Sequence, residues 1–330
     1  MLKPVVTKDN SNEQENVKRE KNKSTKSKTS MDMPSGDIRA TEKVMTDITT
    51  LLNEQQFGST EDAESFLNNL LGSGKMPPAA KTTALQKAQE LIYDAFEVSG
   101  KRRVALARQA LELCSDCADA YVILAEEAAR SIEESKNLYE QGVKAGERAL
   151  GSKMFKNDAG YFWGILETRP YMRARAGLAQ CLWTLGRREE ALEHYRDMLR
   201  LNPNDNQGIR YILANCLLDA GQEQELERLL EQYGDDIAAT WPYTRALLLY
   251  RQEGPSIKAK KALSEAKTCN RFVPPYLLGK KRLPRHLPNY VGIGDENEAI
   301  AYSADALEIW RKTPGALDWL SMNLLHDSGN

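Results

Sequence analysis

The hydrophobic positions of residues 80–270 recur with the spacing of amphipathic helices, and glycine or proline interrupts them at regular intervals. The clearest unit is "GLAQCLWTLGRREEALEHYRDMLRLNPND" at 177–205. Small side chains at Ala179 and Ala191 allow two helices to approach closely. Gly186 permits a backbone conformation that a β-carbon would penalise, so it marks the turn between these helices. The segment therefore predicts a helix–turn–helix unit.

The same pattern recurs, because Leu213, Ala214, Leu217 and Gly221 repeat Leu178, Ala179, Leu182 and Gly186 one unit further along. It resembles the tetratricopeptide repeat, a helix–turn–helix unit of about 34 residues. Less regular units in the same phase occupy 118–150, 207–236 and 240–270. Such units stack into a superhelix with a concave binding face. The sequence therefore predicts an all-α, tetratricopeptide-like solenoid over residues 80–270.

The region before the repeats divides into two parts. Residues 1–38 are rich in Lys, Asn, Ser, Thr and Glu, and they cannot bury enough apolar surface to offset their ordering entropy. We therefore expect a disordered Lys/Ser-rich tail there. Residues 39–79 predict two short amphipathic helices, at 41–55 and 60–72, followed by a linker with the sequence "GSGKMPP".

The region after the repeats, residues 271–330, predicts a proline-rich segment and a helical C-terminal cap. Its prolines favour an extended or turn-rich chain, and they are Pro274, Pro275, Pro284 and Pro288. Asp295 is expected to cap the next helix in a capping box with Glu298. Thr313 is expected to cap the last helix, with Pro314 at its first position. A terminal helical pair would cover the last apolar face of the solenoid.

A second resemblance spans roughly residues 80–320. The stretch "GDENEAIAY" at 294–302, Trp310 and "GAL" at 315–317 are similar to the C-terminal region of the suppressor-of-tumorigenicity-seven proteins. The stretches "TRPYMRAR" and "LNPNDNQGIRY" resemble a group of bacterial tetratricopeptide proteins without an assigned activity. The eukaryotic proteins carry membrane spans, whereas the longest apolar runs here, such as "ALLL" near residue 246, are too short to cross a bilayer.

Composition and charge limit the cellular locations and the classes of partner that are expected. The formal net charge of -2 offers no net field to attract nucleic acid or an anionic membrane, although the lysines of the tail could contact a polyanion. The start "MLKPVVTKDN" lacks the apolar core of a secretory signal, so a cytoplasmic location is expected by elimination. The odd number of cysteines, 5, is typical of reduced thiols in a reducing compartment.

No set of residues in the sequence points to a metal site, a cofactor or a catalytic centre. Cys114 and Cys117 form a C-x-x-C motif, but zinc needs four ligands and the three histidines are scattered. We therefore interpret these cysteines as small thiols at a helix junction. The acidic runs at 188–190 and 295–298 lie at helix starts, where the helix dipole favours negative charge. The sequence thus predicts a protein without cofactor, metal or enzymatic activity.

The candidate binding residues lie on the first helix of each unit, the helix that lines the concave face. They are Arg173, Gln180, Tyr211, Asn215 and Arg245. Arg pairs with carboxylates, Asn with backbone amides, and Tyr adds contact area at low entropic cost, so the set suits an extended peptide. The alternative is that these residues pair with carboxylates of neighbouring helices.

The sequence accordingly favours a non-enzymatic adaptor or scaffold that binds a peptide or helix of a partner protein in the concave groove. A small-molecule substrate is not expected. The alternative is an RNA-associated factor that uses the basic tail and basic helix faces, although the near-neutral net charge argues against nucleic acid as the partner.

Overall fold

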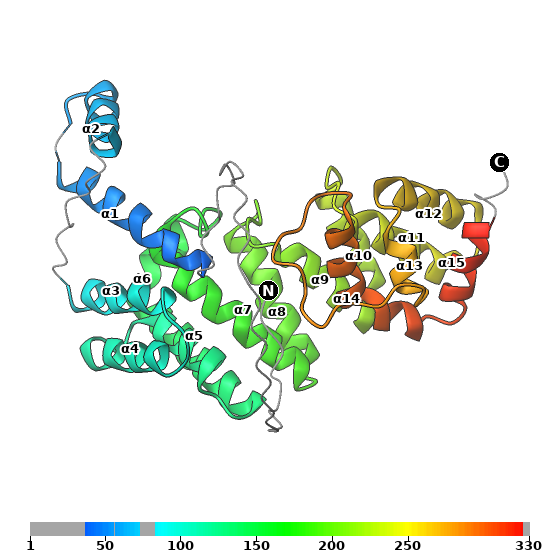
Figure 1. Cartoon of the computed structure of the whole chain (residues 1–330), viewed down its shortest axis with the longest axis horizontal. Coiled ribbons are helices and arrows are strands. Elements are labelled where there is room, and N and C mark those ends of the chain that lie inside the picture. Colours follow the sequence, from blue (N-terminus) through cyan, green and yellow to red (C-terminus); the bar gives the residue numbers. More distant parts are fainter. Residues whose placement is uncertain (1–36, 56, 73–82, 326–330) are drawn as a thin grey trace, which may run out of the picture. The chain divides into compact units, whose positions relative to one another are not determined.

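The computed structural model describes residues 37–55, 57–72 and 83–325 of the chain. Within these ranges the chain forms helices joined by turns and loops, with no strand (Figure 1). The elements are, in order, η1 (Ile38–Ala40), α1 (Thr41–Glu54), α2 (Thr60–Gly72), α3 (Ala84–Phe96), α4 (Gly100–Leu113), α5 (Ala118–Glu127), α6 (Ile132–Asn157), η2 (Leu166–Thr168), α7 (Arg169–Thr184), α8 (Arg188–Leu201), α9 (Ile209–Ala220), α10 (Glu223–Gln232), α11 (Thr240–Glu253), α12 (Ile257–Cys269), α13 (Val273–Leu277), α14 (Glu296–Lys312) and α15 (Ala316–Leu325).

Two compact units make up the structure. Unit 1 comprises the chain up to Gly151 together with Leu166–Leu178, and unit 2 comprises Ser152–Ile165 together with the chain from Ala179 onward. Helices α6 and α7 each contribute residues to both units. The helical path of α6 is broken at Gly151, whose φ of 67° and ψ of 161° lie outside the helical region.

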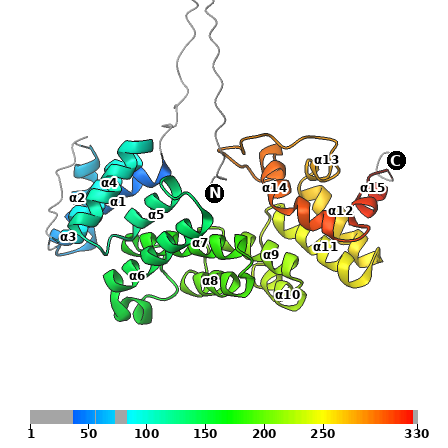
Figure 2. The same ribbon diagram turned by 90° about the horizontal axis from the view of Figure 1, so that it is seen from below.

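Unit 1 is built on helices that pack against their neighbours in the chain. α3 lies beside α4, and α4 beside α5, in both views of the ribbon (Figure 1, Figure 2). Ile92 and Phe96 of α3 are buried in one core with Ala107 and Ala110 of α4 and Ile123 of α5. The two alanines leave room for the larger side chains of α3, as the close approach of paired helices requires.

Helices α6 and α7 approach closely within unit 1 because glycine lies at their contact. A β-carbon on Gly177 would lie 2.2 Å from Cε1 of Tyr139, and one on Gly146 would lie 2.8 Å from Cβ of Tyr171. The Tyr139 side chain is buried. Gly177 therefore provides the space that the Tyr139 ring fills.

Unit 2 continues the pattern of consecutive helix pairs. α8 contacts α9, α9 contacts α10, and α11 lies beside α12. The last helices return to the earlier ones, because α14 packs against α9. Tyr302 of α14 lies over Tyr243 of α11, with ring centroids 5.5 Å apart. The Trp310 ring stacks on Trp319 of α15 and its Nε1 donates to the Tyr302 hydroxyl over 2.9 Å.

The predicted all-α, tetratricopeptide-like helix–turn–helix solenoid is confirmed, and so is its helical C-terminal cap. The helices expected at 41–55 and 60–72 are α1 and α2. Residues 1–36 of the expected tail and the linker at 73–82 lie outside the described residues. Asp37 and Ile38 are described, and η1 begins at Ile38.

The ends of the C-terminal helices differ from expectation. Asp295 caps α14 by accepting from the Glu298 backbone N–H over 2.8 Å, as predicted. The Glu298 carboxylate does not complete a capping box. It accepts instead from the backbone N–H of Ala239 and from Nδ2 of Asn270, because it is buried between the ends of three helices. The proline-rich stretch also holds a short helix, α13, which has proline at its first turn, where no N–H is needed.

Thr313 does not cap the last helix. It is the C-cap of α14, where its hydroxyl donates to the Ile309 carbonyl over 2.9 Å and accepts from Nε of Arg251 over 2.9 Å. The last helix, α15, begins at Ala316. The Thr-Pro pair does mark a helix boundary, but it is the end of α14 and not the start of α15.

Candidate protein-binding face

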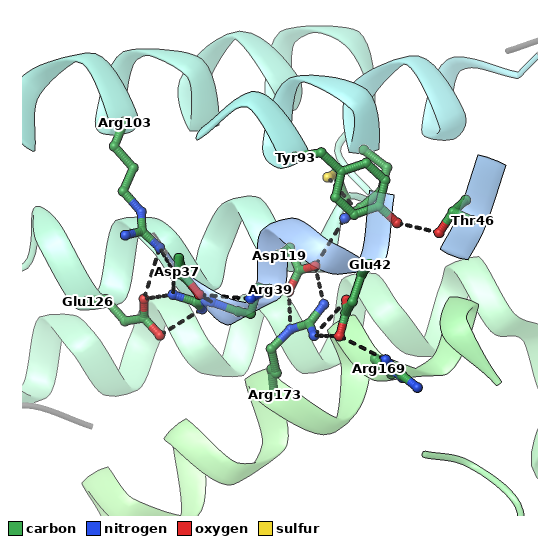
Figure 3. Close-up of polar contacts among 12 residues, drawn as sticks. Asp37, Arg39, Glu42, Thr46, Tyr93, Arg103, Asp119, Glu126, Arg169 and Arg173 are labelled. Atoms are coloured by element: carbon green, nitrogen blue, oxygen red, sulfur yellow. Dashed lines mark hydrogen bonds and ion pairs between the residues drawn. The ribbon is translucent and has the colours of Figure 1, made fainter. Parts of the chain in front are cut away.

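The first-helix face of unit 1 is the surface presented by α3, α5 and α7, the first helices of successive pairs. Arg173 of α7 lies at its centre (Figure 3). Its Nε and Nη2 donate to the two carboxylate oxygens of Asp119 on α5, over 2.8 and 2.6 Å. Its Nη1 donates to both carboxylate oxygens of Glu42 on α1, over 2.9 and 3.0 Å. One guanidinium therefore joins the repeat helices to a helix that precedes them in the chain.

Further donors complete this buried cluster. Nε2 of Gln89 on α3 donates to Asp119 over 3.1 Å, and Nη1 of Arg169 donates to Glu42 over 3.2 Å. Asp119 is fully buried, and the side chains of Arg173 and Glu42 are 10% and 9% exposed. Buried charges need partners for most of their hydrogen-bonding capacity. The cluster meets that need.

A second set of charged contacts is made by Asp37 and Arg39, which precede Glu42 in the chain (Figure 3). Arg39 donates from Nη1 and Nη2 to the Glu126 carboxylate of α5, over 3.0 and 2.8 Å. Asp37 accepts from Nη2 of Arg103 on α4 over 2.6 Å. The Arg39 guanidinium also lies over the Phe96 ring, 4.6 Å from its centroid. Asp37 and Arg39 thus each pair with a side chain of opposite charge, Arg103 on α4 and Glu126 on α5.

The electrostatics of the cluster follow from its burial. Burial opposes ionisation of Asp37, but hydrogen bonds and charge from Arg39, with a further bond from Arg103, hold its pKa at about 2. Burial, with the nearby charges of Asp119 and Glu42, raises the pKa of Tyr93 to about 12 although a hydrogen bond with Thr46 opposes the shift. Tyr93 and Thr46 share that hydrogen bond over 2.8 Å. Asp37 is therefore ionised and the Tyr93 phenol is neutral at neutral pH.

The remaining sequence-predicted residues lie in unit 2. Gln180 on α7 is exposed, and so is Arg245 on α11, whose Nη2 makes a long bond of 3.4 Å to the Leu230 carbonyl. Tyr211 donates to Asp236 over 2.8 Å and accepts from Arg210. Asn215 is half-buried, and its Oδ1 has no hydrogen-bond partner in the described chain. Arg173 thus pairs with carboxylates on neighbouring helices, and Tyr211 with Asp236 in the loop between α10 and α11, whereas Gln180 and Arg245 are exposed to solvent.

A helix from outside the repeats also covers part of the first-helix face in unit 2. α14 packs against α9, and Nζ of its Lys312 donates to Asp219 of α9 over 2.8 Å. Each unit therefore holds one such helix, α1 in unit 1 and α14 in unit 2.

The C-x-x-C motif lies between α4 and α5, at the helix junction. Cys117 is buried, and its Sγ lies 3.7 Å from Oε1 of Gln89. Burial raises the pKa of the Cys117 thiol, which disfavours the thiolate that metal binding or redox chemistry would use. Among the residues that the structure describes, no group of three or more His, Cys, Asp or Glu side chains could hold a metal ion.

Sequence reasoning missed Asp119 and Glu42, the two partners of Arg173. A signal for Asp119 was present, because it is an acid in the otherwise apolar stretch "ADAYVILA". A carboxylate at a core position requires a buried cation. No comparable signal marked Glu42, whose helix reads as an ordinary amphipathic one.

The helix pairs and their first-helix face define an all-α repeat protein of the tetratricopeptide-like class. In the comparison with protein families, residues 79–326 match the family model described as ST7 protein, and the chain belongs to the ST7 family. It is 34% identical over 264 residues to the human "Suppressor of tumorigenicity 7 protein-like", covering 72% of this chain and 44% of that protein.

Other relatives agree with this placement. The chain is 31% identical over 273 residues to "Protein ST7 homolog" of Drosophila melanogaster, covering 74% of this chain and 49% of that protein. The chain thus spans less than half the length of these two relatives.

A solved structure, "YrrB: a TPR protein with an unusual peptide-binding site", is 21% identical, with a TM-score of 0.39 over 67% of this chain and 91% of that one. Among the described helices, none is both long enough and apolar enough to cross a membrane.

Proposed function

We propose that this chain is a non-catalytic protein-interaction scaffold whose first-helix faces bind a helix or peptide of a partner protein. One observation supports the proposal above others: in each unit this face holds a helix from outside the repeats, α1 or α14. In unit 1 the contact consists largely of charged hydrogen bonds from Arg173, Arg103 and their neighbours. Such contacts give specificity and orientation to a helix bound on a groove or face.

For unit 2 we propose that Gln180 and Arg245 contact the partner, since both are exposed on first helices. Tyr211 and Asn215 lie on α9 between them, where Tyr211 is fixed by Asp236. The role we propose for this pair is to shape the surface.

The alternative of an RNA-associated factor has less support. Prominent cations on the repeat helices are paired: Arg196 with Glu189 and Glu225, and Arg210 with Asp205 and Asp236. Paired cations contribute little to nucleic-acid binding, because that binding depends on free Lys and Arg side chains that neutralise phosphates and so release the counterions held by the nucleic acid.

The test is a pull-down from native extract that compares the full chain with a Gln180→Glu/Arg245→Glu variant. We expect a stoichiometric protein partner to be retained by the wild type and reduced at least about tenfold with the variant, as loss of about 1.4 kcal/mol of binding free energy would give. The matched control is Lys261→Glu/Ser264→Glu on α12, a second helix, where both residues are exposed and the charge change is the same. Equal loss with the control, or no loss with either, would contradict the assignment. Circular dichroism checks that all three proteins are folded.

A further inference from the structure

The segment formed by η1 and α1, residues 37–54, lies across the first-helix face of unit 1 and contacts all three of its helices (Figure 3). We propose that this segment is an intramolecular ligand, and that a partner helix with carboxylates spaced as Asp37 and Glu42 are displaces it. The idea deepens the proposed function and rests on it, because it names the chemistry of the partner that unit 1 takes.

The face is prepared for a carboxylate independently of α1. Asp119 fixes the Arg173 guanidinium through Nε and Nη2, and Gln89 in turn fixes Asp119. These contacts lie entirely within α3, α5 and α7, so they persist when α1 leaves. Nη1 of Arg173 is then left pointing at the position that Glu42 occupies. A positioned donor of this kind reduces the ordering that a partner's carboxylate must impose.

The segment itself is attached by charged and polar contacts and by few apolar side chains, among them Ala40, which packs against the core of unit 1. In α1 only Glu42 and Leu51 are buried, while Val44 and Met45 are 49% and 47% exposed. Buried ion pairs gain little net free energy over their desolvation, although they discriminate strongly between partners. The contact between α1 and the first-helix face of α3, α5 and α7 therefore supplies more selectivity than affinity, which is what an exchangeable ligand requires.

The chain connection also permits exchange. Residues 55–83 join α1 to α3, and the helix within them, α2, has no buried side chain. Release of α1 therefore breaks no core outside its own contact. The pattern that the face reads is Asp37 and Arg39 at η1, Glu42 in the first turn, and Thr46 one turn later. A competing protein helix must begin with the same acid–base–acid order.

The experiment measures binding of a labelled synthetic peptide of residues 37–54 to the full chain by fluorescence anisotropy. The test protein is Asp37→Asn/Glu42→Gln, which removes both carboxylates of the segment and leaves the face intact. Its matched control is Glu61→Gln/Glu64→Gln, which makes the same charge change on exposed positions of α2. Apparent affinity scales with the fraction of molecules whose face is open. We expect the test protein to bind the peptide at least about tenfold more tightly than the wild type or the control does.

A peptide carrying Asp37→Asn and Glu42→Gln should bind none of the three proteins. Equal affinity of the native peptide for all three proteins, or no binding to any, would overturn the proposal. Hydrogen–deuterium exchange provides a second readout: residues 41–54 should lose amide protection in the test protein while α3, α5 and α7 keep theirs. Unchanged protection of 41–54 would also overturn it. Neither readout involves unit 2 or an extracted partner, so failure here leaves the Gln180/Arg245 test standing.

Discussion

Replacing Arg173 with methionine should lower the free energy of unfolding by about 3 to 5 kcal/mol. Methionine keeps much of the packing volume but removes the cation that, among the described residues, pairs with both Asp119 and Glu42. Asp119 is fully buried, and the Gln89 amide would be left as its hydrogen-bond donor among the described residues. Leaving a buried carboxylate without a cation is among the most destabilising effects that a single substitution can have.

The matched control is Arg196→Met in α8. Arg196 also bridges two carboxylates, Glu189 and Glu225, but its side chain is 31% exposed and water can replace the lost bonds. We expect it to cost less than about 1 kcal/mol. Urea denaturation followed by circular dichroism measures both variants, because the tryptophans all lie in unit 2 and their fluorescence does not report on unit 1. If the two variants lost similar amounts of unfolding free energy, burial of the Arg173 cluster would not make its ion pairs contribute more to stability than exposed ones do.

The second large effect is expected at Gly177. Replacing an interior helical glycine with alanine ordinarily stabilises a helix by up to about 1 kcal/mol. Here the new β-carbon would lie 2.2 Å from the buried Tyr139 ring, which has no open space to move into without disturbing the contact between α6 and α7. We expect Gly177→Ala to lower the free energy of unfolding by about 2 kcal/mol, as overpacking in a core does. The sign is therefore opposite to the helix-propensity expectation.

Gly72→Ala at the end of α2 is the control for this substitution. A β-carbon there would meet nothing within 4 Å, so no overpacking arises. We expect no loss of stability from Gly72→Ala in the same urea titration. A neutral or stabilising Gly177→Ala would mean that the two helices separate more readily than their contact indicates.

The local pattern of the sequence is sufficient to predict the fold. The spacing of Leu178, Ala179 and Leu182 fixes a buried face, and Gly186, whose φ is 77°, fixes the turn. Both signals act within one helix pair, so they can be read without knowing any long-range contact. The ST7 family match, residues 79–326, spans the whole of residues 80–320, over which the sequence resembles that family.

The candidate site could be predicted only in part, because its chemistry depends on partners far apart in the chain. Arg173 was identified as a carboxylate-binding residue, and it does bind carboxylates. The sequence left open whether they belong to a partner or to neighbouring helices. In this structure the two carboxylates that Arg173 contacts, Asp119 and Glu42, lie on helices of the same chain. Periodicity places Arg173 on the first-helix face, but it carries no information about which segment lies against that face.

Site-specific photo-crosslinking tests the central claim, that first-helix faces are the protein-binding surface, most directly. A benzophenone amino acid would be introduced at Gln180 on a first helix, or at Lys261 on a second helix, both exposed positions of unit 2. After irradiation in native extract, we expect a discrete crosslinked protein from position 180 that is absent from position 261. Crosslinking from position 261 alone, or the same products from both positions, would contradict the account.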